Sequence, residues 1–227
     1  MTKLIIFDLD GTLLNTINDL ATATNYALTE NGFPTHPVEA YNFFVGNGIH
    51  KLMERALPQE ARSEEQILRI KAAFLLFYEA HKRDLTEPYK GIPELLLELQ
   101  AKGIKLAVAS NKYHLATQKL VTSYFPNIHF EAVLGQRENI AIKPDPTIIE
   151  EIVTVCNVEK KEVLFVGDSG VDMLTAQNAG VNSVGVTWGF RLEKELKAFS
   201  PTHIVTNPDE IRQLVASSFH WNEQKKS

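Results

Sequence analysis

Short apolar runs recur along the chain, and each ends near a small or polar residue. A run that is apolar throughout, rather than alternating with polar residues, is typical of a strand buried on both faces of a parallel sheet. Segments with helical periodicity lie between several of these runs, and one of them, residues 147–156, carries an apolar stripe. The pattern predicts strands over residues 4–7, 106–109, 132–134, 163–166, 183–186 and 203–205, and helices over 93–102, 147–156, 171–179 and 208–217.

This alternation of strands and helices predicts an α/β fold with a doubly wound, Rossmann-like parallel sheet. The stretch between the first strand and Tyr89 breaks the alternation, because it shows helical patterns and no convincing strand. We therefore expect an inserted helical cap domain over residues 15–84. The α/β core domain would consist of residues 1–14 and 85–227, and short hinge strands would lie near Asn15 and near residues 86–88.

Polar side chains follow the predicted strands at the points where the strands end. The carboxyl ends of parallel strands meet at one edge of a sheet, where ligands bind at a switch in strand order. Each of these residues alone could be a turn former or a helix cap. Their order along the chain favours a single site instead. The residues concerned are Asp8 and Asp10, Ser110 and Asn111, Lys143 in a loop before a helix, and Asp168 and Asp172.

The chemistry of this set predicts a bound cation. Four carboxylates gathered around one lysine would repel each other strongly unless a cation lay among them. Oxygen-only ligands favour a hard cation such as Mg²⁺ over zinc, for which His and Cys ligands would be expected. Asp168 and Asp172 are four residues apart, so they would share one helix face, where like charges are unfavourable without compensation.

Four segments in this order resemble the motifs of the haloacid dehalogenase superfamily. They are Asp8-Leu9-Asp10-Gly11-Thr12-Leu13, Ser110-Asn111, Lys143-Pro144-Asp145-Pro146 and Gly167-Asp168-Ser169-Gly170-Val171-Asp172. The resemblance extends from residue 4 to about residue 191. A helical insertion directly after the first motif resembles the cap of the phosphatase and phosphomutase branch. Residues 45–48 (VGNG), with 51–57, and residues 185–191 (GVTWGFR) look like the corresponding segments of phosphoglycolate phosphatases.

The resemblance implies a mechanism with a phosphorylated carboxylate. Asp8 would attack phosphorus and form an aspartyl-phosphate that water then hydrolyses. Asp10 would protonate the leaving oxygen and later deprotonate the water. Lys143 would bridge the nucleophile and the phosphate as a point charge, and Ser110 and Asn111 would bind the phosphate together with it.

The same resemblance implies a Mg²⁺ cofactor. Asp8, the backbone carbonyl of Asp10, and Asp168 would be its ligands. Asp172 would not bind the ion directly; it would contact a metal-bound water or Lys143. Family members that are dehalogenases lack the second aspartate of the first motif, so the presence of Asp10 favours a phosphatase.

The leading hypothesis is a Mg²⁺-dependent phosphatase of a small phosphorylated metabolite, with phosphoglycolate as the first candidate. Asn47 and Lys51 are candidates for contacting the substrate beyond its phosphate, with Arg55 and Arg191 as further ones; the alternative for Lys51 and Arg55 is a solvated helix face. A sugar phosphomutase similar to β-phosphoglucomutase and an inorganic pyrophosphatase remain alternatives within the family. A non-enzymatic, receiver-like phospho-aspartate module is the alternative from another class.

The amino-acid composition limits the classes of binding partner and the cellular compartment that we expect. The chain has 227 residues, with 23 Lys and Arg against 28 Asp and Glu. Its net charge of −5 argues against non-specific nucleic-acid binding, which needs a basic surface. The single cysteine, Cys156, excludes an internal disulfide and fits a reducing compartment. No apolar run approaches the ~20 residues of a membrane span. We expect a cytoplasmic protein without a membrane partner, and its oligomeric state stays open.

Overall fold

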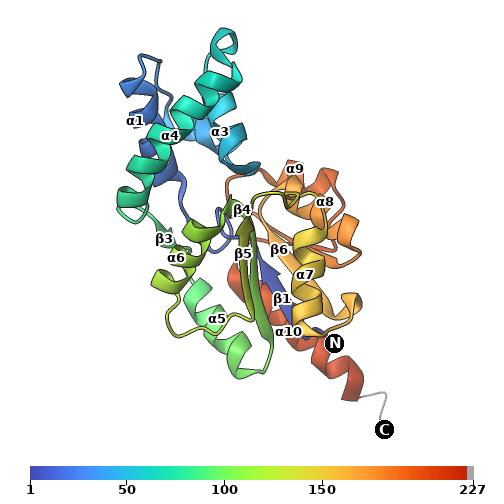
Figure 1. The fold of residues 1–227 in the computed structure, drawn as a ribbon. Coiled ribbons are helices and arrows are strands. Elements are labelled where there is room, and N and C mark those ends of the chain that lie inside the picture. Colours follow the sequence, from blue (N-terminus) through green and yellow to red (C-terminus); the bar gives the residue numbers. More distant parts are fainter. Residues whose placement is uncertain (224–227) are drawn as a thin grey trace.

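A parallel sheet forms the centre of the protein (Figure 1). The structure, a computed structural model, describes residues 1–223, with side chains described as far as residue 216. Six strands follow the order β5-β4-β1-β6-β7-β8, and every neighbouring pair is parallel. The strands are β1 (Leu4–Phe7), β4 (Lys105–Tyr113), β5 (Ala132–Gln136), β6 (Val163–Gly167), β7 (Asn182–Val186) and β8 (His203–Val205).

Helices cover both faces of this sheet because successive side chains of each strand point to opposite faces. In β1, Ile5 and Phe7 join a core with α5, α6 and α10, whereas Leu4 and Ile6 join a second core with α7 and α8. The predicted doubly wound α/β fold is therefore confirmed. The helices are α5 (Ile92–Ala101), α6 (His114–Tyr124), α7 (Thr147–Cys156), α8 (Gly170–Ala179), α9 (Glu193–Ala198) and α10 (Pro208–Glu223), with a short 3₁₀ turn at Lys160–Glu162.

The sheet changes direction of winding at β1. The chain runs from β1 to β4 and β5 on one side, and then returns to place β6, β7 and β8 on the other side. Such a switch leaves a crevice at the carboxyl ends of the central strands. The residues that follow β1, β4 and β6 therefore share one edge of the sheet.

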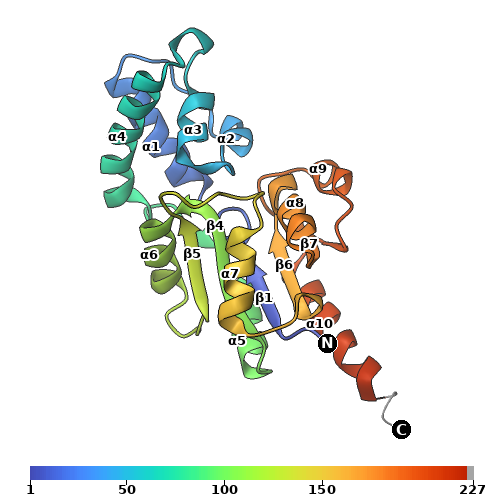
Figure 2. The ribbon, with the colours of Figure 1, turned by 45° about the vertical axis from the view of Figure 1, so that its right-hand side comes forward.

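A helical insertion, residues 17–81, stands over this edge (Figure 2). It packs around a hydrophobic cluster of its own, separate from the two cores of the sheet. Two short antiparallel strands, β2 (Leu14–Asn15) and β3 (Glu87–Pro88), connect it to the sheet. Its helices are α1 (Ile17–Glu30), α2 (Val38–Phe44), α3 (Gly48–Ala56) and α4 (Glu64–His81), with a 3₁₀ turn at Gln59–Ala61.

Strand β4 and helices α6 and α9 differ from the sequence-based expectation, and α9, like α6, was not expected. The strand expected at 106–109 continues to Tyr113, because Tyr113 pairs with Gln136 of β5 after a shift in register. Helix α6 follows it directly and was not predicted, since its sequence HLATQKLVTSY mixes polar and β-branched residues without a clear stripe. Its buried residues, such as Leu120 and Val121, pack on the core that contains α5.

No helix within residues 1–223 is both long enough and apolar enough to cross a membrane.

Candidate active site

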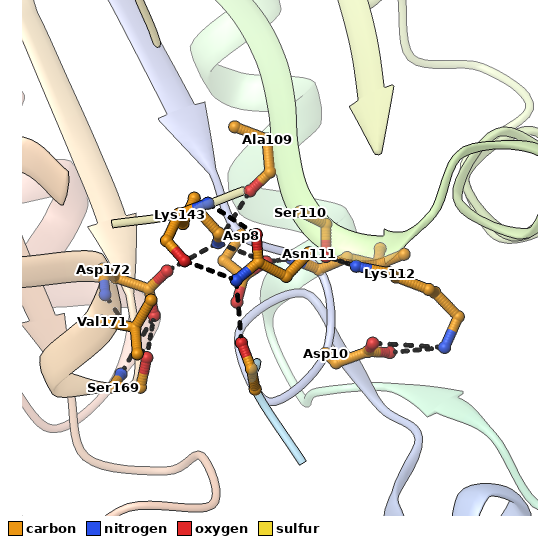
Figure 3. A network of polar contacts seen from close by, with 12 residues as sticks. Asp8, Asp10, Ala109, Ser110, Asn111, Lys112, Lys143, Ser169, Val171 and Asp172 are labelled. Carbon is orange, nitrogen blue, oxygen red and sulfur yellow. Dashed lines mark hydrogen bonds and ion pairs between the residues drawn. The ribbon is translucent and has the colours of Figure 1, made fainter. Parts of the chain in front are cut away.

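Asp8 lies at the centre of a polar network at the carboxyl end of β1 (Figure 3). Its backbone N–H donates to the carbonyl of Val166 in β6 at 2.9 Å, and its Oδ1 accepts from the backbone N–H of Leu9 at 2.7 Å. Gly11 has a φ of +83°, which lets the chain turn sharply after the strand. The carboxylate of Asp8 is thereby held at the edge of the sheet and lines a cavity there.

Lys143 joins Asp8 to Asp172 inside the protein. Its Nζ lies 3.0 Å from Asp8 Oδ1 and 2.7 Å from Asp172 Oδ1, and its side chain is only 1% exposed. The same Nζ donates to the carbonyl of Ala109 at 3.0 Å. Asn111 fixes the backbone of Lys143, because its amide accepts from Lys143 N at 2.8 Å and donates to Lys143 O at 3.0 Å. Two residues of β4 therefore position the lysine.

Asp172 is committed to contacts within the protein. Its Oδ1 pairs with Lys143, while its Oδ2 accepts from the backbone N–H and the hydroxyl of Ser169, at 3.1 and 2.6 Å. Ser169 and Asp172 form the capping box that begins α8. Asp172 therefore orients Lys143 from the first turn of a helix, while Asp168, just before that helix, remains on the cavity side.

Asp168 is buried with little compensation for its charge. Its Oδ2 accepts from the backbone N–H of Phe190 at 2.7 Å. Gly11 and Gly189 lie so close that a Cβ on either would be 2.3 Å from the Asp168 side chain. Burial, together with the nearby charges of Asp172 and Asp8, raises the pKa of Asp168 well above its usual range.

The three carboxylates of Asp8, Asp168 and Asp172 have oxygens within 4.8 Å of one another. Burial also raises the pKa of Asp8 to about 7, although Lys143 favours its ionised form. One lysine thus faces three buried acids, and an all-oxygen donor set is what a hard divalent cation requires. The residues present fit such an ion.

Asp10 points away from this cluster and has a cation of its own. Lys112 Nζ lies 3.0 Å and 3.2 Å from its two carboxylate oxygens, and the Thr16 hydroxyl donates to Asp10 Oδ1 at 2.7 Å. Figure 3 shows the Lys112–Asp10 pair to one side of the Lys143–Asp172 pair. Lys112 is a site residue that was not expected from the sequence. Its position directly after Ser110 and Asn111, at the end of a strand, was the available signal.

A cavity of about 110 Å³ lies between the sheet edge and the helical insertion. Its floor, which comes from the sheet, is polar and charged, whereas its roof, which comes from the insertion, is largely apolar. The floor residues are Asp8, Asp10, Ser110, Asn111, Lys112, Tyr113, Ala116, Asp168 and Ser169, and Phe190 and Arg191 line it from the segment after β7. The roof residues are Leu20, Val45, Gly46, Gly48, Ile49, Leu52, Phe74, Leu75, Tyr78 and one acid, Glu79.

Hydrogen bonds connect the two sides of the cavity. The Asn111 amide donates to the carbonyl of Gly46 at 3.0 Å. Arg191 Nη2 donates to the carbonyl of Val45 at 2.8 Å. Both carbonyls belong to the segment between α2 and α3, so residues of β4 and of the segment after β7 reach across to the insertion.

The residues expected to contact the substrate beyond its phosphate lie in different places. Arg191 lines the cavity. Lys51 does not; its Nζ pairs with Glu54 at 2.6 Å, and nearly half of its side chain is exposed. Asn47 and Arg55 also lie outside the lining, and Arg55 Nη2 donates to Asn47 Oδ1 at 2.9 Å. The helix that carries Lys51 presents Ile49 and Leu52 to the cavity instead.

Comparisons with known proteins show which family and which relatives the chain resembles. A family model described as haloacid dehalogenase-like hydrolase matches residues 5–186. The chain is 34% identical over 221 residues to a phosphoglycolate phosphatase of Vibrio parahaemolyticus, covering 95% of this chain and 97% of the relative. It is 36% identical over 219 residues to a phosphoglycolate phosphatase of Pasteurella multocida, covering 94% and 96%.

A solved structure shows the same arrangement. The crystal structure of a protein from Lactobacillus delbrueckii subsp. bulgaricus, to which phosphoglycolate phosphatase activity has been ascribed, matches with a TM-score of 0.89 at 33% identity. The match covers 95% of this chain and 99% of that one. The likeness therefore includes both the sheet and the helical insertion.

Proposed function

This chain belongs to the family of haloacid dehalogenase-like hydrolases and is a phosphoric monoester hydrolase, and we propose that its substrate is phosphoglycolate. The relatives named above are phosphoglycolate phosphatases by name. The observation that carries the proposal is the pairing of Asp8 with the buried Lys143 at the floor of a small cavity that Asp10 also lines. We further propose that residues 15–84 act as a cap domain and that the enzyme works in the cytoplasm.

In the first step Asp8 attacks the phosphorus, and the bond between phosphorus and the glycolate oxygen breaks. Lys143, 3.0 Å from Asp8 Oδ1, stabilises the negative charge shared by the carboxylate and the phosphoryl oxygens. The Ser110 hydroxyl and the backbone N–H groups after β1 supply further hydrogen bonds. Asp10 donates its proton to the leaving oxygen, so that glycolate departs as an alcohol.

In the second step water attacks the phosphorus of the aspartyl-phosphate and displaces Asp8. Asp10, now ionised, accepts the proton of this water, which regenerates the acid for the next cycle. Lys112 and Thr16 hold both oxygens of Asp10 in place, at 3.0 Å and 2.7 Å for Oδ1. A carboxylate that must exchange a proton twice per cycle benefits from such fixed orientation.

We propose Mg²⁺ as the cofactor. Asp8, Asp168 and the Asp10 backbone carbonyl would hold the ion, and Asp172 would support the site through Lys143. When bound, Mg²⁺ neutralises charge on the phosphate oxygens and on the crowded carboxylates. Support comes from the three buried acids, which lie within 4.8 Å of one another, while Lys143 pairs with two of them and leaves part of their charge uncompensated.

The apolar roof favours a substrate with a small leaving group rather than a sugar phosphate. A hexose would need several polar partners for its hydroxyls, whereas Ile49, Leu52, Phe74 and Leu75 offer none through their side chains. The roof also limits the entry of stray water during phosphoryl transfer. This favours the phosphatase over the phosphomutase, which otherwise would share the chemistry of the floor.

A phosphate-release assay tests the proposed function. The purified protein would be given phosphoglycolate, glucose phosphates, nucleotides and pyrophosphate, each with Mg²⁺ and with EDTA. We expect the highest kcat/KM on phosphoglycolate and loss of turnover in EDTA. Higher kcat/KM on pyrophosphate, or exchange between glucose phosphate isomers, would contradict the proposal. Activity that is unaffected by EDTA would refute the cofactor assignment.

A further inference from the structure

We propose that Lys112 of the floor and Tyr78 of the roof form the subsite for the substrate's carboxylate. The inference rests on the proposed function, because it assigns a partner to the acidic end of phosphoglycolate. It explains how a cavity with an apolar roof could bind a substrate that carries a charge at both ends. Of the sequence-based candidates for this role, Asn47, Lys51 and Arg55 do not line the cavity, whereas Arg191 does.

Lys112 has the charge and the position for this role. Its side chain is 6% exposed and lines the cavity. An ammonium group has three N–H donors, and its described hydrogen bonds go to the two oxygens of Asp10. The third N–H has no hydrogen bond to a carboxylate, and the Tyr78 hydroxyl is its neighbour. A buried ammonium forms its strongest hydrogen bonds with a carboxylate.

Tyr78 supplies the second donor from the opposite side. The ring lies in α4 and lines the cavity, and Lys112 Nζ is 4.8 Å from its centroid. Its hydroxyl is buried and interacts with the Lys112 ammonium, but its own O–H has no acceptor within the described part of the chain. A buried O–H without an acceptor is costly. A ligand oxygen held between Tyr78 and Lys112 would satisfy it.

The chemistry of the substrate directs the carboxylate to this side. Asp10 protonates the oxygen of the leaving group, so this oxygen must lie near Asp10. In phosphoglycolate a single CH₂ group separates that oxygen from the carboxylate. The carboxylate must therefore lie close to Asp10, and Lys112 is the cation bound to Asp10.

The other cations near the cavity are less suited to bind the substrate's carboxylate. Lys143 is committed to Asp8, Asp172 and the Ala109 carbonyl. Arg191 donates to the Val45 carbonyl, and its Nε lies 3.4 Å from Glu195. Its Nη1 is buried without a hydrogen-bond partner within the described part of the chain, which makes Arg191 the rival candidate. Among the residues described as lining the cavity, Lys112 and Arg191 are the cations, and only Lys112 adjoins the acid that serves the leaving group.

The first experiment measures selectivity. Ethyl phosphate matches phosphoglycolate in chain length but lacks the carboxylate. The ratio of kcat/KM for the two substrates would be measured for the wild type, Lys112→Met and Tyr78→Phe. We expect the ratio to fall by about 10- to 100-fold in Lys112→Met and by about 3- to 10-fold in Tyr78→Phe. Tyr78→Phe retains the ring, so it tests the hydroxyl even if Lys112→Met folds poorly.

The second experiment separates binding from the support of Asp10. In an Asp8→Asn background, which cannot form the aspartyl-phosphate, calorimetry with Mg²⁺ would give the Kd of both compounds with and without Lys112→Met. A loss of affinity confined to phosphoglycolate would support the subsite. Equal losses for both compounds, or an unchanged kcat/KM ratio, would show that Lys112 only orients Asp10 and would overturn the inference. A wild type that hydrolyses neither compound would instead refute the proposed function, while the binding measurement would still test the subsite.

Discussion

The floor and the roof of the cavity are built in opposite ways. The floor comes from residues at the ends of neighbouring parallel strands, and charged side chains pair with one another there, as Lys143 pairs with Asp8 and Asp172. The roof comes from the helical insertion and presents side chains such as Ile49, Leu52 and Phe74. The sheet thus concentrates charge, while the insertion removes water from around it.

This difference suggests a division of labour. Charges act more strongly where water is excluded, so the apolar roof strengthens the interactions of the floor. Changes in the floor should therefore affect the reaction or the stability of the whole protein. Changes in the roof should affect the choice of substrate. The following predictions test this division, from the largest expected effect to the smallest.

Asp8→Asn removes the nucleophile from the floor. We expect phosphate release to fall by at least about 10⁴-fold, because loss of a covalent nucleophile eliminates the pathway that the site supports. The fold should persist without Mg²⁺, since the change removes a buried charge. Phosphate release and circular dichroism would be compared with Asp209→Asn, an exposed aspartate in α10. Residual activity of more than a few per cent would refute the role of Asp8.

Lys143→Met leaves Asp8 and Asp172 buried without their cation. We expect the free energy of unfolding in urea to fall by about 3–5 kcal/mol at neutral pH without metal, as when one partner of a buried ion pair is removed. Lys160→Met is the matched control, because the Lys160–Glu150 pair is about half exposed and should contribute less than about 1 kcal/mol. Equal effects of the two changes would contradict the structure of the floor.

The raised pKa values of Asp8 and Asp168 predict how metal-free stability depends on pH. Between about pH 4 and pH 7 the folded protein retains protons that the unfolded chain has lost, since the pKa of Asp8 is raised from 3.8 to about 7. The free energy of unfolding should therefore decrease as the pH rises through this window. Thermal melts in EDTA at pH 5, 6 and 7.5 would measure this trend.

Mg²⁺ should restore the stability that the metal-free protein loses as the pH approaches 7. An ion at about 100 times its Kd adds about 2.7 kcal/mol, which raises Tm by about 5–10 °C for a chain of this size. The increase should be larger at pH 7.5 than at pH 5, because protonated carboxylates bind the ion poorly. A Tm increase that is the same at both pH values would argue against metal binding by these acids.

Leu75→Ala enlarges the roof without changing the floor. Leu75 lines the cavity, whereas its neighbour Leu76 is 81% exposed and does not. We expect kcat/KM for 2-phospholactate, which carries an extra methyl group, to improve relative to phosphoglycolate by up to about 10-fold. Leu76→Ala should leave this ratio unchanged. The same shift in both variants would indicate a general loosening of α4 rather than contact with the substrate.

The sequence by itself determined the strands of the sheet and most of the floor. The run from Leu4 to Phe7 is apolar throughout and is buried on both faces, so its pattern alone predicts a central parallel strand. Asp8, Asn111 and Asp168 directly follow strands or lie at their ends. Because the carboxyl ends of parallel strands share one edge, sequence position was enough to predict that they converge.

Tertiary structure decided which lysine pairs with which aspartate, and which side of the insertion faces the floor. Lys112 and Asp10 are 102 residues apart, and their pairing depends on β4 extending to Tyr113 against β5. Helix α3 carries both Lys51 and Leu52, and only packing selects which of them faces the cavity. Local periodicity identifies a helix and its apolar stripe, but the partner of that stripe depends on contacts between segments far apart in the chain.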